Sequence, residues 1–155
     1  MTTVSSPVVQ QAQEALQSHQ LLAEALMALW EQSVNQLTLA HAEAWTAVLE
    51  NKQHALDAIR ALEPVALFTH CRQLDATLRT TGHEILADRL QEVMQQNAAR
   101  FGTVAAIEQE AEELLHQQQE ELGAVLRQRT QRDQARLRYQ STTVGDHSRF
   151  LDRQR

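Results

Sequence analysis

Residues 7–62 read PVVQQAQEALQSHQLLAEALMALWEQSVNQLTLAHAEAWTAVLENKQHALDAIRAL, and they determine the architecture of this chain. After Pro7 the stretch contains neither proline nor glycine, and it is rich in Ala, Leu, Gln and Glu, which lose least by being helical. Ser6 is placed to cap its first turn, and Pro64 pushes the residue before it out of helical geometry. We therefore predict one long helix over 7–62. A bend or a change of partner is left open near 34–37, where polar residues weaken the apolar stripe.

Two more helices follow from the same kind of pattern. Residues 64–81 place their apolar residues on one face and end at Gly82, a natural left-handed terminator. From 83 to about 139 the apolar positions recur with a period near 3.5 residues, which is typical of coiled coils. Asn97 and Gln118 lie inside that stripe, where polar residues fix register at a cost in stability.

These patterns predict an all-α fold, an elongated antiparallel helical bundle or coiled coil of two long helices joined by a shorter one. The long helix over 7–62 is expected to pair antiparallel with the seam of 83–126. We expect a single helical domain over 1–155, with a flexible tail at 140–155 that includes a loop-like stretch near 141–146.

The net charge of −6 hides an asymmetry between the body and the end of the chain. Residues 1–126 carry six basic and seventeen acidic residues, a balance of −11, whereas residues 127–155 carry eight arginines and three aspartates, a balance of +5. An acidic body with a basic end indicates a binding surface. The alternative is that Arg132, Arg136 and Arg138 complement the dipole of a helix C-terminus.

The cysteine content, the first residues and the apolar runs of the sequence indicate the cellular compartment of the protein. The one cysteine, Cys71, excludes an internal disulfide, fits a reducing compartment, and lies on an apolar stripe as a small buried hydrophobe. The opening residues show no secretory signal, and the most apolar run, 21–30, is interrupted by Glu24 and is too short to span a bilayer. We expect a cytoplasmic protein without membrane insertion.

The sequence offers no catalytic or metal-binding signature. None of the seven histidines stands four residues from another, and neither a Walker loop nor a G-x-S-x-G motif occurs, so we expect no enzymatic activity, no metal and no cofactor. His70 could in principle carry a phosphoryl group, as in histidine phosphotransfer domains, but the lysine and small residue that follow the histidine there are missing here. The acidic body and scarce aromatics argue against nucleic acid as a partner.

Three short stretches resemble the FlgN-type export chaperones of flagellar type III secretion. Residues 50–59 (ENKQHALDAI) are similar to the charged, Lys-containing segment late in the family's long helix, and residues 96–102 (QNAARFG) to its Asn-rich segment ending in Gly. Tyr139, a Gly-containing loop and residues 148–153 (SRFLDR) resemble the family's tail.

The resemblance implies a cytoplasmic, non-enzymatic chaperone of flagellum biogenesis. It would bind the amphipathic helices of secreted flagellar subunits, the hook–filament junction proteins, and deliver them to the type III export machinery. The alternative is a structural coiled-coil protein, either a secretion stalk or a phasin-like granule-coating protein; a histidine phosphotransfer domain is less favoured. Self-association as a homo-oligomer is left open.

The apolar seam is lost after Leu126, where Arg129, Arg132 and Arg136 take the expected apolar places. Exposed aromatic residues beside arginines are typical of binding hot spots. The predicted partner-binding residues are Val125, Leu126, Arg129, Arg132, Arg136, Tyr139, Arg149, Phe150 and Leu151.

Two tryptophans lie off the narrowest seam of the first helix. Trp30 and Trp45 are favoured as cover for the flank of a bundle core, and the alternative is that each anchors another chain.

Overall fold

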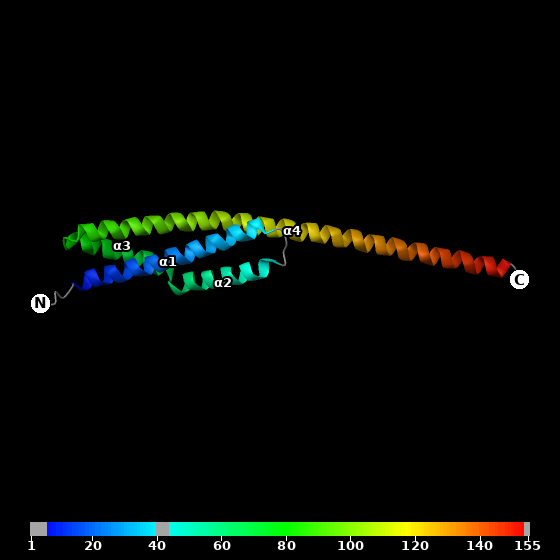
Figure 1. Cartoon of the computed structure of the whole chain (residues 1–155), viewed down its shortest axis with the longest axis horizontal. Helices are drawn as coiled ribbons and strands as arrows, with labels where there is room; N and C mark the ends of the chain where they lie inside the picture. The colour runs from blue at the N-terminus through cyan, green and yellow to red at the C-terminus, as the bar shows by residue number, and fades with distance from the viewer. Residues whose placement is uncertain (1–5, 40–43, 154–155) are drawn as a thin grey trace. The chain divides into compact units, whose positions relative to one another are not determined.

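The structure, a computed structural model, describes the backbone of residues 6–39 and 44–153 and their side chains as far as Ser141. Over these residues it contains four helices and no strand (Figure 1), so the predicted all-α class is confirmed. By its contacts the chain divides into two units, Met1–Glu112 and Glu113–Arg155, and each is described by itself. The helices are α1 (Pro7–Thr38), α2 (Trp45–Ala61), α3 (Pro64–Thr80) and α4 (Glu84–Arg153).

The single helix predicted over 7–62 is wrong, because α1 ends at Thr38 and α2 begins at Trp45. Leu39 already has an extended backbone, with ψ at 126°. Neither proline nor glycine lies near this break, so local sequence does not explain it. Packing does: α2 folds back on α1 and buries Trp45 and Ile59, and tertiary burial of this kind outweighs helix propensity.

Side-chain contacts in the first unit show that α1 and α4 run parallel. Asn97 of α4 meets His19 of α1, and further along both helices Glu108 meets Ser33. The predicted antiparallel pairing of these two helices is therefore wrong. Because α2 turns back along α1, the later reversal between α3 and α4 returns the chain to the direction of α1 (Figure 1).

The antiparallel neighbours of α1 are α2 and α3 in succession. Lys52 of α2 contacts Gln36 near the end of α1, while Phe68 of α3 contacts His19 in its first half. The first unit is thus a three-helix bundle along its whole length. Alongside α1 and α4, the third helix is α3 at the N-terminal half of α1 and α2 at its C-terminal half.

Two hydrophobic clusters form the core of the first unit. The first joins α1, α3 and α4 through Ala12, Ala15, Cys71, Leu74, Leu78, Ala87 and Leu90. The second joins α1, α2 and α4 through Leu22, Ala25, Leu26, Leu29, Ala55, Ile59 and Val104.

The turns between helices follow local chemistry. Gly82 has φ of +83° and follows α3, which confirms its predicted role as a left-handed terminator. Glu63, between α2 and α3, is also left-handed, with φ of 47°; Pro64 disfavours the right-handed helical conformation at this residue, as predicted. Ser6 is the N-cap residue of α1 as predicted, although its side chain makes no capping bond.

The third predicted helix begins within one residue of its expected start but ends later than expected. The backbone of α4 is helical as far as Arg153, so the predicted helix end near 139 and the loop near 141–146 are wrong, whereas the flexibility of 140–155 stays a prediction. Residues 154–155 lie outside the described part of the chain. Among the described residues, no helix combines the length and apolarity needed to cross a membrane.

Candidate protein-binding surface

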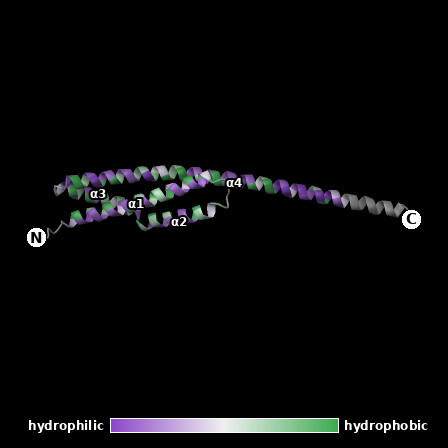
Figure 2. Cartoon of the chain, in the orientation of Figure 1, coloured by the Kyte–Doolittle hydropathy of each residue, from purple (hydrophilic) through white to green (hydrophobic). Residues whose placement is uncertain are grey.

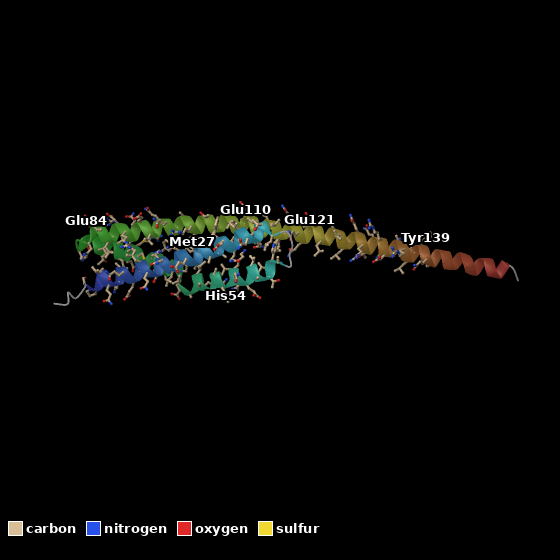
Figure 3. All side chains as sticks on the ribbon, viewed as in Figure 1. Met27, His54, Glu84, Glu110, Glu121 and Tyr139 are labelled. Carbon is tan, nitrogen blue, oxygen red and sulfur yellow. The ribbon has the colours of Figure 1, made fainter. Side chains whose placement is uncertain are left out.

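Six of the nine predicted partner-binding residues lie in the second unit on the part of α4 from 113 to 141, which we call the docking segment. Val125, Leu126 and Tyr139 are 59%, 52% and 76% exposed (Tyr139 is labelled in Figure 3). The side chains of Arg129, Arg132 and Arg136 are exposed as well. Those of Arg149, Phe150 and Leu151 lie outside the described residues.

Most of these residues share one face of the helix. From Leu122 the steps of three, four, three, four and three residues lead through Val125 and the three arginines to Tyr139. The face is therefore apolar at both ends and cationic between them. Leu122 and Leu137, at 61% and 65% exposure, were missing from the predicted set. Leu122 lies on the same face as Val125, whereas Leu137 directly follows Arg136 in the sequence and lies beside that face.

The charge of the docking segment changes sign along its length. Glu113, Glu120 and Glu121 precede the exposed apolar residues, and five arginines with one aspartate follow between 127 and 138. Figure 2 colours most of this segment hydrophilic, with isolated apolar residues among the charges. Such a face offers a partner helix both a hydrophobic contact and a charge pattern to match.

In the first unit, by contrast, several polar side chains are buried in the core. Asn97 is fully buried, as its place in the seam predicted, and its Nδ2 donates to Nδ1 (2.8 Å) and to the carbonyl oxygen (2.9 Å) of His19. Arg100 Nη1 donates to the other end of the same amide, Oδ1, at 2.9 Å. This bond fixes the orientation of the amide, so Nδ1 of His19 must accept and the imidazole proton resides on Nε2. Burial lowers the pKa of His19, which favours this neutral form.

A second buried polar cluster ties three helices together. Lys52 Nζ of α2 donates to Gln36 Oε1 of α1 at 2.9 Å and lies 2.8 Å from Glu108 Oε1 of α4. Ser33 Oγ contacts the same carboxylate and bonds to the carbonyl oxygen of Leu29. Sequence reasoning missed this cluster, because Ser33 read only as a weakening of the apolar stripe and Gln36 was not singled out.

The two tryptophans differ in their surroundings. Trp45 is 2% exposed, which confirms its predicted place in the core. Trp30 is 42% exposed and lines a small apolar hollow of about 150 Å³ between α1 and α4, together with Met27 and Val104. Trp30 therefore lies at the edge of the second core cluster and is only partly covered, so its predicted place on the flank of the core and the alternative of an anchor for another chain both stay open.

Cys71 is fully buried in the first cluster, as predicted, and burial raises the pKa of its thiol to about 11. His70 lies next to it on the exposed face of α3. Across the described residues, no three His, Cys, Asp or Glu side chains are grouped so as to hold a metal ion.

Comparisons of this chain with protein families, with curated proteins and with solved structures found no match. The resemblance to FlgN-type chaperones therefore stays a prediction.

Proposed function

We propose that this protein is a non-enzymatic, cytoplasmic export chaperone, similar in role to the FlgN-type family, and that its docking segment holds an amphipathic helix of a secreted flagellar subunit. One observation carries the proposal: apolar side chains at Leu122, Val125, Leu126, Leu137 and Tyr139 are each more than half exposed on one helix. Leu122, Val125 and Leu126 form one exposed apolar group and Leu137 and Tyr139 a second, and arginines lie between them, which is the composition of a binding hot spot.

The chemistry of the segment supports an amphipathic, acidic helix as the partner. Its apolar residues would pack against the apolar stripe of that helix, as in helix-in-groove recognition. Arg129, Arg132 and Arg136 would face acidic side chains, which mainly speeds encounter and sets specificity.

The experiment is a calorimetric titration of the full-length protein with the terminal helix of a hook–filament junction protein encoded in the same genome. The test variant carries Val125→Gln and Leu126→Gln. We expect its Kd to rise at least about tenfold, since loss of two central apolar contacts should cost at least about 1.4 kcal/mol. Both residues are exposed, so the fold should be unaffected.

The control variant carries the same substitutions at exposed sites of the first unit, Val65→Gln and Leu49→Gln, where the side chains are 84% and 45% exposed. Its Kd should equal that of the unaltered protein. If neither protein binds a junction-protein helix, or if the test variant binds as well as the control, the proposal is wrong. Binding to polyester granules instead would favour the phasin-like alternative.

A further inference from the structure

A groove runs along the parallel pair α1 and α4 in the first unit, well away in sequence from the docking segment. Two hollows that share Arg100 make up what we call the groove: one of about 480 Å³ and the small apolar hollow beside Trp30. Every lining residue comes from α1 or α4 and none from α2 or α3. From Gln13 to Trp30 it follows seventeen residues of α1, or about 26 Å at 1.5 Å per residue.

The charge of the groove is opposite to that of its surroundings. Its lining includes Arg89 and Arg100 and no acidic residue, although residues 1–126 carry a balance of −11. Arg100 bonds to the neutral Asn97 side chain, and no ion pair of Arg89 or Arg100 occurs among the described residues. An acidic ligand is therefore attracted to this groove and repelled by most of the remaining body.

The far end of the groove is shaped for one apolar side chain. Trp30, Met27 and Val104 surround a hollow with almost no polar surface, and Met27 (labelled in Figure 3) is 61% exposed. An exposed tryptophan beside a methionine and an arginine has the composition of a binding hot spot.

We propose that this groove is a second docking surface, and that its occupant is an acidic amphipathic helix of a protein partner. The helix lies along α1 and α4, presents carboxylates to Arg89 and Arg100, and inserts one large apolar side chain beside Trp30. The two arginines stand eleven residues apart, and Val104 follows four residues after Arg100. The occupant therefore carries two acidic residues at about that spacing and an apolar anchor about one turn beyond the second.

The probe is a synthetic helical peptide without tryptophan, with two glutamates and a leucine at these spacings, prepared in both sequence directions. Binding is followed by iodide quenching of the full-length protein. Trp30 and Trp45 are its only tryptophans, and Trp45 is buried, so the quenching reports Trp30. We expect at least one peptide to protect Trp30 saturably, and a peptide with glutamine for both glutamates to bind at least about tenfold more weakly.

Two variants locate the site: Arg89→Glu and Met27→Glu, both at exposed positions, should each weaken binding at least about tenfold. Leu49→Glu on α2 is the matched control and should bind like the unaltered protein. The inference is overturned if neither peptide protects Trp30, if the glutamine peptide binds equally well, or if the groove variants bind like the control. It is also overturned if Trp30 is already protected from iodide in the absence of peptide, because the protein self-associates, and if Met27→Glu abolishes that self-association. Because the docking segment contains no tryptophan, this result does not depend on the proposed function.

Discussion

Replacing Lys52 by methionine should destabilise the first unit by about 2 kcal/mol. The substitution keeps the length of the apolar stem but removes the ammonium group that joins Gln36 to Glu108. The amide oxygen of Gln36, a residue that is 2% exposed, then loses its donor, and the Glu108 carboxylate loses its cation.

The magnitude follows from the exposure of the pair. Removing one partner of a fully buried ion pair costs about 3–5 kcal/mol, whereas exposed pairs contribute about 0–1 kcal/mol. The side chains of Lys52 and Glu108 are 10% and 34% exposed, so the cost of breaking the pair lies about midway between these limits, near 2 kcal/mol. In a double-mutant cycle with Glu108→Gln, we expect a coupling energy of about 1–2 kcal/mol.

The assay is urea unfolding followed by tryptophan fluorescence, because Trp45 is buried at the start of the same helix as Lys52. The control is Arg60→Met, since Arg60 and Asp57 lie 3.8 Å apart with side chains 73% and 60% exposed. That change should alter the unfolding free energy by less than about 0.5 kcal/mol. If Lys52→Met costs no more than the control, or if the cycle gives no coupling, the reasoning about the buried cluster is refuted.

Three further changes test the turns and the buried histidine. Glu63→Gly should stabilise the protein by about 0.5 kcal/mol in urea unfolding. Glycine removes the left-handed strain at φ of 47°, but the greater conformational entropy of glycine in the unfolded chain offsets part of that gain. A loss of stability would contradict this. Gly82→Ala should destabilise it by about 1 kcal/mol for the converse reason, since an added Cβ meets no atom within 4 Å and only the φ of +83° opposes it; an unchanged urea midpoint would show that the turn relaxes freely. His19 should make stability fall as pH drops below about 6.5, because its folded-state pKa is lowered by burial and the unfolded chain therefore takes up the proton first. His19→Gln should reduce this fall in unfolding experiments between about pH 7.5 and 5.5, and an equal fall in both proteins would place its origin elsewhere.

The sequence predicted what local chemistry controls. Pro64 and Gly82 punctuate helices through their own backbone preferences, so the start and end of α3 were found to within a residue. The end of α1 at Thr38 has no such signal, because it depends on α2 packing back against α1. Missing that one reversal also gave the wrong relative direction for α1 and α4.

Hydropathy could not reveal the polar residues on the buried face of α1. The buried positions of α1 include the regular series 12, 15, 19, 22, 26, 29, 33 and 36, and three of these are the polar residues His19, Ser33 and Gln36. Their burial depends on partners distant in sequence, Asn97, Lys52 and Glu108, which only the fold brings together. The burial of Asn97 could be predicted because this residue stands in an otherwise regular apolar stripe of the helix over 83–139.

The exposure of residues 122–139 was predictable for the opposite reason. It follows from the loss of apolar residues after Leu126, which the sequence displays directly. Leu137 was missed because it stands alone among polar residues, and an isolated leucine carries no periodic signal.

Hydrogen–deuterium exchange of the full-length protein, with and without the terminal helix of a hook–filament junction protein, tests the docking assignment most directly. In the free protein, amides 113–141 belong to a helix whose side chains are largely exposed, and we expect fast exchange. With the partner bound, protection should rise at least about tenfold across residues 122–139 and stay unchanged in α2. Protection that appears only outside 113–141 would contradict the account.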